Sequence, residues 1–416
     1  MSGDAIVVVG AQWGDEGKGK IVDVMAESAD VVVRYAGGPN AGHTLVIGGE
    51  KIVLHQLPAG IVRPFKTCVV GPMVACDPQV LVDELRIADE VMRGLKGLAD
   101  IWLDPRAPVI LPIHKLIDAG REDSSGADKI GTTKRGIGPC YEDLFARRGV
   151  RLADLVDADR LRAKLTRSRY YEERCAVAAL HGIKEIPSMD ETIEWCLQFG
   201  SEIVPRLRDT VPLVHEHLTA GKHVLFEGAQ SVLLDVLHGD QPNTTSSFCG
   251  ANGVSASFNL FHFDRIVGVT KAYTTRVGSG PFPTELLDEV GATLRQIGQE
   301  RGATTGRDRR TGWLDLPALK HAVKSSGIRE LVVTKLDVLG QFPEFKVCVE
   351  HAPKPVYVSL PGWKQTAEED ISHCHVREKL PIGAKLLLDM IERFTGIPVS
   401  AIGTGADRTS KIFPPS

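Results

Sequence analysis

The feature that most constrains the fold is a glycine-rich turn that directly follows an apolar run near the start of the chain. Residues 7–23 read VVVGAQWGDEGKGKIVD, and Gly14 to Lys20 fit the spacing G-x-x-x-x-G-K. A strand that ends in such a turn and opens a helix is typical of a phosphate-binding loop, because backbone N–H groups and the helix N-terminus attract anions. The sequence therefore predicts an α/β fold with an anion-binding loop at residues 14–20.

Alternating strand and helix patterns continue along the rest of the chain. Helical patterns such as residues 78–95 and 205–219 lie between short apolar runs. These runs predict strands at 5–9, 31–35, 67–71, 223–227, 265–270 and 330–334. The alternation predicts a large central, mostly parallel sheet covered by helices, with the phosphate loop in its core.

Two segments depart from this alternation. Residues 151–205 are charged and helix-favouring, which predicts a helical excursion from the core. Residues 340–370 alternate and contain several prolines, which predicts a small antiparallel appendage, followed by a helix at 382–395. We expect residues 1–416 to form a single large α/β domain, with 340–416 as its small C-terminal portion.

The composition limits the partners and the compartment. A net charge of −4 gives no reason to expect general nucleic-acid or membrane binding, and no apolar run approaches the roughly 18 residues of a membrane helix. Eight scattered cysteines without a Cys-x-x-Cys pair are typical of reduced thiols, so we expect a cytoplasmic protein. His373, Cys374 and His375 are too close together to form a tetrahedral metal site alone, which favours a surface loop.

The phosphate loop itself departs from the usual pattern in two ways. Ile21 stands where a Ser or Thr normally supplies a hydroxyl to Mg²⁺, and Asp15 places a carboxylate where phosphate would be repelled. Asp15 can replace the missing magnesium ligand or act as a base beside the phosphates, and the residues alone leave both open. The absence of a G-x-G-x-x-G motif argues against a dinucleotide-binding dehydrogenase.

A second motif indicates which nucleotide the loop binds. Thr334-Lys335-Leu336-Asp337 follows a predicted strand. The Asp337 carboxylate can accept hydrogen bonds from the N1–H and N2 amino group of guanine, a donor pair that adenine lacks. Together with the phosphate loop, this motif favours GTP over ATP.

Further polar loops offer groups for catalysis and binding. Residues 37–46 (GGPNAGHTLV) contain His43, which titrates in a range suited to proton donation near neutrality. Residues 302–315 contain three arginines, whose guanidinium groups pair with carboxylates and phosphates. Residues 129–143 look like a mobile loop rich in hydroxyls and glycines, and 226–235 follow a strand and contain Gln230, which can contact a purine edge.

These motifs together resemble those of the adenylosuccinate synthetase family. The chain contains, in the family's order, QWGDEGKGK, NAGHT, IGTTKRGIGP, FEGAQ, TTSS, TTGRDRRTGWLD, TKLD and GTGADR, from residue 12 to residue 408. The resemblance implies a GTP-dependent ligase that forms adenylosuccinate from IMP and L-aspartate, the first committed step from IMP to AMP. It implies that GTP phosphorylates O6 of IMP and that the amine of aspartate then displaces phosphate at C6.

The resemblance also implies roles for individual residues. Asp15 would be the base that removes the N1 proton of IMP, His43 the acid, and Lys18 a further catalytic group that offsets the repulsion between Asp15 and phosphate. Asp15 and the carbonyl of Gly42 would bind one Mg²⁺ in each subunit. The family works as a homodimer, so Arg147 would reach the IMP site of the other subunit.

The same resemblance assigns the binding residues. IMP would contact Asp15, Glu16, Gly17, Lys18, Asn40, Ala41, Gly42, His43, Thr133, Arg147, Gln230, Thr245 and Arg307. Aspartate would contact Ala303, Thr304, Thr305, Gly306, Arg307, Asp308 and Arg309. GTP would contact Gly14, Asp15, Glu16, Gly17, Lys18, Gly19, Lys20, Gly42, His43, Thr44, Arg309, Lys335, Leu336, Asp337, Gly403, Thr404 and Gly405.

Several positions depart from the family's pattern. Pro39 replaces a polar residue, Asp308 places an acid among the arginines, and Gly403 and Ala406 stand where Ser and Pro are usual. The alternatives are a GTPase switch, which shares a phosphate loop and a TKxD motif but has no use for Asp15 beside His43, and a catalytically silent scaffold.

Overall fold

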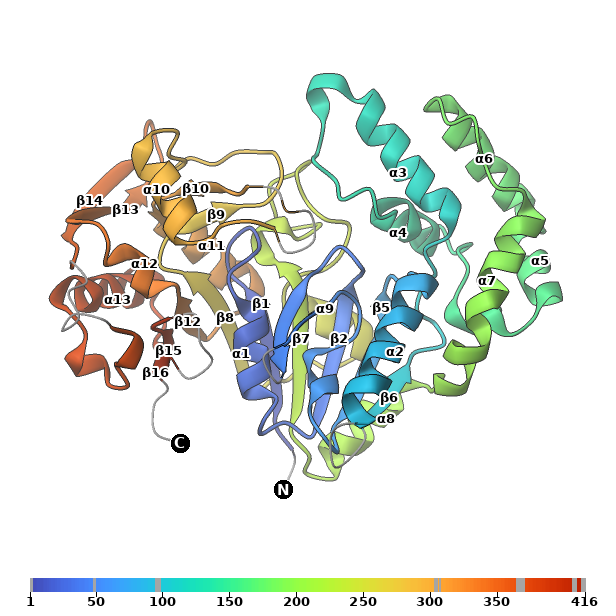
Figure 1. The fold of residues 1–416 in the computed structure, drawn as a ribbon, viewed down its shortest axis with the longest axis horizontal. Helices are drawn as coiled ribbons and strands as arrows, with labels where there is room; N and C mark the ends of the chain where they lie inside the picture. The colour runs from blue at the N-terminus through green and yellow to red at the C-terminus, as the bar shows by residue number, and fades with distance from the viewer. Residues whose placement is uncertain are drawn as a thin grey trace.

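A nine-stranded sheet forms the centre of the molecule (Figure 1). The computed structural model describes residues 3–47, 50–93, 99–302, 306, 308–363, 371–405 and 410–412. The strands of the central sheet are β1 (Ala5–Gly10), β2 (Val31–Gly37), β5 (Thr67–Val74), β6 (Asp100–Leu103), β7 (Val224–Ser231), β8 (Arg265–Lys271), β12 (Glu330–Thr334), β15 (Val399–Gly403) and β16 (Lys411–Ile412). Their order is β16-β15-β12-β8-β1-β7-β2-β5-β6, and the β15/β16 pair alone is antiparallel. The predicted mostly parallel sheet is confirmed.

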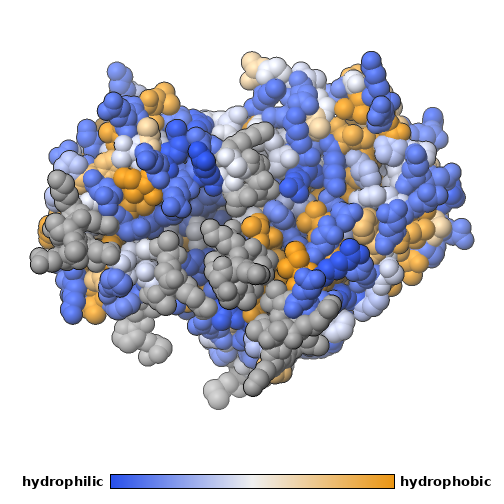
Figure 2. Space-filling view, viewed as in Figure 1, coloured by the Kyte–Doolittle hydropathy of each residue, from blue (hydrophilic) through white to orange (hydrophobic). Residues whose placement is uncertain are grey.

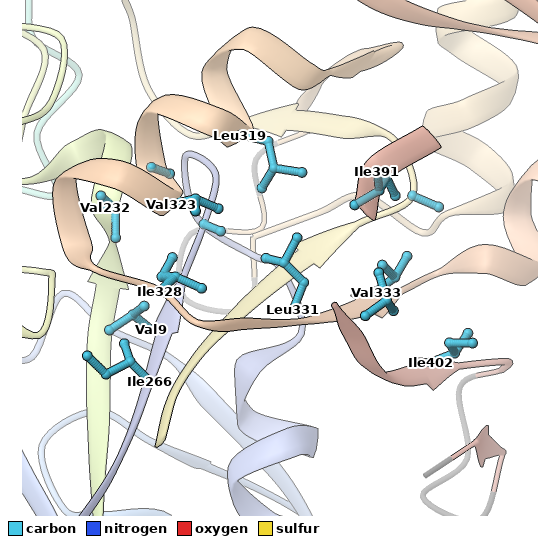
Figure 3. Close-up of a cluster of buried hydrophobic side chains, with 14 of the residues drawn as sticks. Val9, Val232, Ile266, Leu319, Val323, Ile328, Leu331, Val333, Ile391 and Ile402 are labelled. Carbon is cyan, nitrogen blue, oxygen red and sulfur yellow. The ribbon is translucent and has the colours of Figure 1, made fainter. Parts of the chain in front are cut away.

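Most residues of the central strands are apolar because both faces of the sheet are buried. In β12, Leu331 and Val333 belong to one apolar cluster, whereas Val332 between them belongs to the cluster on the other face. β1 alternates in the same way. Figure 3 shows the first cluster, where side chains of the sheet such as Val9 and Leu331 lie with Leu319 and Ile391 from the covering helices.

Helices cover both faces, and a group of helices extends beyond one edge. The first cluster includes side chains of α8 (Thr210–Thr219), α9 (Asn252–Phe258), α11 (Leu316–Ser326) and α13 (Ile382–Thr395). The cluster on the other face of the sheet includes side chains of α1 (Lys18–Met25) and α2 (Pro78–Arg93). Beyond β6, Figure 1 shows α3 (Pro112–Ser124), α4 (Ile137–Phe145), α5 (Ala158–Thr166), α6 (Tyr170–Leu180) and α7 (Met189–Ile203) side by side. The division of the chain into domains stays a prediction.

Two predicted boundaries were wrong for local reasons. The helix expected over 205–219 begins at Thr210, because Val204–Arg206 form a 3₁₀ turn and the Asp209 side chain caps the helix. The loop expected over 129–143 contains the start of α4, which follows Gly136 in the left-handed conformation (φ 76°).

Small sheets complete the structure. β13 (Glu344–Glu350) and β14 (Val356–Pro361) form the predicted antiparallel pair, and β11 (Leu314–Asp315) adds to β13 in parallel. The antiparallel pairs β3 (His43–Ile47)/β4 (Glu50–Leu54) and β9 (Thr274–Arg276)/β10 (Arg310–Gly312) were not expected. A further short helix, α10 (Glu289–Ile297), packs on β10.

None of the helices in the described residues is long and apolar enough to cross a membrane. Figure 2 shows hydrophilic side chains over most of the visible face, with hydrophobic ones in separate small groups.

Candidate active site

Segments that are far apart in sequence leave the sheet at the carboxyl ends of its parallel strands. The phosphate loop follows β1, residues 38–43 follow β2, and Lys335 follows β12. In parallel α/β sheets, ligands bind in the crevice outside these ends. A cavity of about 560 Å³ lies there, lined by the phosphate loop and by segments after β2, β7 and β9.

This cavity brings together many of the predicted site residues. Those that line it are Gly14, Asp15, Glu16, Gly17, Lys18, Gly19, Lys20, Asn40, Ala41, Gly42, His43, Thr133, Gln230, Asp308 and Arg309. Within the described part of the chain, Arg147, Thr245, Gly306, Lys335, Leu336, Asp337, Gly403, Thr404 and Gly405 lie outside this lining. Thr44 lies in β3, and the predicted residues Ala303, Thr304, Thr305 and Arg307, like Ala406, lie outside the described residues.

The backbone of the phosphate loop turns sharply at Asp15. Asp15 has a positive φ of 59° between Gly14 (φ 101°) and Gly17 (φ 82°). Such a conformation is strained for a residue with a Cβ and is often found at functional sites. The Asp15 side chain is 38% exposed, and its Oδ2 accepts a hydrogen bond from Nε of Arg309 at 2.5 Å. The turn therefore leaves the Asp15 carboxylate accessible in the cavity, beside Arg309 from the lining segment 308–310.

Glu16, the second acid of the loop, is buried and holds the loop together. Its Oε1 accepts from the backbone N–H groups of Gln12 (3.2 Å) and Gly14 (2.9 Å), and Lys18 Nζ donates to Oε2 at 2.6 Å. Burial would raise the pKa of Glu16, but the Lys18 charge and hydrogen bonds outweigh it, so the pKa is lowered. In this structure the Lys18 ammonium is thus paired with Glu16, and the cation beside Asp15 is Arg309.

His43 lies in a buried polar cluster with Glu227 and Arg34. Nδ1 of His43 and Nη1 of Arg34 both contact Oε1 of Glu227, the latter at 2.5 Å. The backbone N–H of Ala59 donates to the other oxygen at 2.8 Å. Burial and the Arg34 charge lower the pKa of His43 against the pull of Glu227. The carboxylate contact assigns a proton to Nδ1.

Two further segments predicted to bind GTP adjoin the phosphate loop, although they do not line the cavity. The Thr334 hydroxyl donates to the carbonyl of Glu16 at 2.6 Å, and Lys20 Nζ donates to the carbonyl of Gly405 at 2.8 Å. Lys335 Nζ donates to the carbonyl of Gly298 at 2.6 Å. The residues 334–337 and 403–405 are therefore neighbours of the loop, as a GTP site requires.

The prediction missed one wall of the cavity. Arg276 and residues 277–279 form this wall, whereas the adjoining Arg310 belongs to the arginine cluster already noted in the sequence. Arg276 is buried, contacts the Trp13 ring, and donates to Asp240 at 2.6 Å, while its Nη2 has no hydrogen-bond partner within the described part of the chain. The run TTRVGSG at 274–280, polar and glycine-rich soon after a strand, could have indicated this wall.

Asp308, one of the positions that depart from the family's pattern, forms an ion pair with Arg301. Asp308 accepts a hydrogen bond from Nε of Arg301 at 3.0 Å. Arg301, which lies outside the run 307–310, therefore partly balances the negative charge of Asp308.

Comparisons with known proteins agree with this arrangement. A sequence model of the family "Adenylosuccinate synthetase" matches residues 7–412. The chain is 44% identical to the adenylosuccinate synthetase of Chromohalobacter salexigens (99% of this chain and 98% of that one) and 46% identical to that of Sorangium cellulosum (98% of both). The structure of fully ligated adenylosuccinate synthetase from Plasmodium falciparum superposes with a TM-score of 0.89 at 33% identity, covering 99% of this chain and all of that one.

Proposed function

The chain belongs to the adenylosuccinate synthetase family, a class of ligases, and we propose that it joins IMP to L-aspartate through a 6-phosphoryl-IMP intermediate. In this reaction O6 of IMP attacks the γ-phosphorus of GTP and GDP leaves. The amine of aspartate then attacks C6, and phosphate leaves with O6. The products are adenylosuccinate, GDP and phosphate.

The observation that carries the proposal is the accessible carboxylate of Asp15 inside a phosphate-binding turn. O6 of IMP is a poor nucleophile until N1 loses its proton, so a base is needed where the purine ring meets the terminal phosphate. The backbone N–H groups of the loop attract the phosphates, and Arg309 supplies positive charge beside Asp15. Asp15 is therefore proposed as the base.

His43 is proposed as the acid on the phosphoryl side. Glu227 orients the imidazole through its contact with Nδ1. Nε2 lies 3.3 Å from Nη1 of Arg34, and it becomes available to the substrate when the Arg34 side chain moves away. A proton on Nε2 would be stabilised by negative charge that builds up during phosphoryl transfer and by the Glu227 carboxylate.

The residues fit the Mg²⁺ expected for this family. Asp15 offers a partly exposed carboxylate oxygen, and Gly42 offers a backbone carbonyl on the cavity wall. Mg²⁺ prefers few protein oxygens together with substrate phosphates and water, and when bound it would supply charge that stabilises the phosphoryl oxygens.

The decisive test is a coupled assay of the purified chain. Phosphate release should require IMP and aspartate together, and adenylosuccinate should accumulate in equal amount. Rapid phosphate release from GTP alone would instead favour a GTPase switch, and no release with all three substrates would favour a silent scaffold.

The proposed homodimer gives a separate prediction for Arg147. Arg147 is exposed at the end of α4 and lies outside the cavity, as expected of a residue that acts in a neighbouring subunit. Arg147→Ala should raise the KM for IMP about 10–100-fold, the loss of a charge-assisted contact to phosphate, and leave the KM for GTP unchanged. Arg169→Ala, at an exposed arginine elsewhere, is the control; Arg147 (φ 64°) and Arg169 (φ 56°) both have a positive φ, so backbone strain introduced by Ala is matched in the two variants.

A mixing experiment distinguishes a shared site from a local effect. Subunits with Asp15→Asn and subunits with Arg147→Ala are each impaired, but a mixed dimer contains one site with both native residues. Activity should therefore rise when the two are mixed and allowed to exchange. No rise, with exchange verified by mass spectrometry, would argue against a shared site.

A further inference from the structure

Three side chains with metal-binding chemistry meet away from the cavity, where β11 lies beside β13. Asp315 and Cys348 are partners in the parallel pairing of these strands, and His351 follows the end of β13. One ligand atom of each lies within 4.8 Å of the others. Asp315 and Cys348 are buried, and the His351 side chain is 37% exposed. The cluster is thus anchored on two strands and open to solvent on one side.

The donor set selects a class of metal. Cys348 and His351 form a Cys-x-x-His pair, to which Asp315 adds an oxygen. Thiolate, imidazole and carboxylate together suit Zn²⁺ and similar transition metals, whereas Mg²⁺ and Ca²⁺ require mostly oxygen ligands. Three protein ligands and one water would complete a tetrahedral site, and the exposed edge of His351 gives the water a place.

The contacts inside the cluster suit this use. His351 Nε2 lies 2.8 and 2.9 Å from the two oxygens of Asp315, so a small displacement of the ring would admit an ion between them. Oδ1 also accepts from the backbone N–H of Ala318 at 2.9 Å, which fixes the carboxylate as outer-shell contacts do in metal sites. Among the described residues, His351 is the group that forms an ion pair with this buried carboxylate.

The nearby helix opposes a cation only weakly. Asp315 caps the N-terminus of α11, where the helix dipole slightly disfavours a positive charge. Bonds from three protein ligands to a metal ion are far stronger than this dipole effect, so the dipole does not decide the outcome. We propose that Asp315, Cys348 and His351 form a zinc-type site that ties β11 to β13.

Such a site would stabilise the segment that leads out of the cavity. β11 follows β10, which begins at the cavity residue Arg310. Metal binding is therefore expected to raise the melting temperature, because the ion binds the folded chain and not the unfolded one. It takes no part in the proposed ligase reaction.

Cobalt titration of the metal-free chain tests the proposal. One equivalent of Co²⁺ should produce a thiolate-to-cobalt absorption band, which a magnesium site built of oxygens cannot give. Cys348→Ser should abolish the band, and His351→Asn should weaken Co²⁺ binding by at least about tenfold. Zn²⁺ should displace Co²⁺ and raise Tm in the native chain but not in Cys348→Ser.

A matched control uses Cys374, which lies between two histidines in the sequence. Cys374→Ser removes a thiol from the segment 373–375 and should leave the band intact. The proposal is overturned if no thiolate band forms, or if the band survives in Cys348→Ser. Circular dichroism of each variant without metal shows whether a loss of binding follows from misfolding.

Discussion

Asp15→Asn is expected to lower kcat by at least about a thousandfold while GTP binding stays measurable. A general base contributes about 10²–10⁴ to a rate, and this carboxylate is also the proposed Mg²⁺ ligand. Asparagine keeps the shape of the side chain and can still accept a hydrogen bond from Arg309, but it cannot take the N1 proton. The coupled assay gives kcat, and calorimetry with a GTP analogue gives Kd.

The choice of asparagine separates chemistry from backbone strain. Position 15 has a φ of 59°, which Asn adopts more readily than most residues, whereas Ala would add strain and confound the result. Glu27→Gln, an exposed acid beyond the end of α1, is the control and should keep full activity. If Asp15→Asn kept kcat within tenfold of the native chain, the base would have to be sought elsewhere in the cavity.

The parts of the molecule that the sequence predicted correctly are those governed by local rules. The strand, glycine turn and helix around Gly14 to Lys20 are neighbours in sequence, and β12 was predicted with its observed ends because Leu331, Val332 and Val333 are apolar and the two valines are β-branched. The family resemblance added segments that no local rule connects, such as 403–405, which touches Lys20.

What could not be predicted depends on long-range contacts. The two acids of the phosphate loop look alike in sequence, yet Glu16 is buried against Lys18 and only Asp15 is accessible. Arg276 looks like any loop arginine until the fold places it in the cavity wall. Glu227 was noted as part of a motif, but its pairing with Arg34 spans 193 residues, so no spacing could reveal it.

That pairing makes Glu227→Gln the substitution with the largest expected effect on stability. Glu227 and Arg34 are both fully buried, and the carboxylate also contacts His43 and the N–H of Ala59. Replacing the acid leaves the Arg34 charge buried without its counter-charge, which typically costs about 3–5 kcal/mol. Urea denaturation at pH 7, followed by circular dichroism, should show a much lower midpoint.

A surface ion pair supplies the matched control. Glu202 pairs with Arg86 at 2.7 Å, but both side chains are at least one-third exposed. Glu202→Gln should cost less than about 1 kcal/mol, because exposed pairs contribute little. Equal losses in the two variants would mean that the buried cluster is not held together by the Glu227 charge.

The pH dependence of the free energy of unfolding is a second test of the negative charge on Glu227. Burial opposes ionisation of Glu227, but His43 and Arg34 outweigh it and lower the pKa to about 2 from an ordinary value of 4.5. A carboxyl with a lowered pKa stabilises the fold above its unfolded pKa, and this contribution is lost as the pH falls from about 4.5 toward 2. The native chain should therefore lose stability over that range more steeply than Glu227→Gln, which has no such group to protonate. Parallel curves would contradict an ionised Glu227, and with it the proposal that this carboxylate orients His43 for phosphoryl transfer.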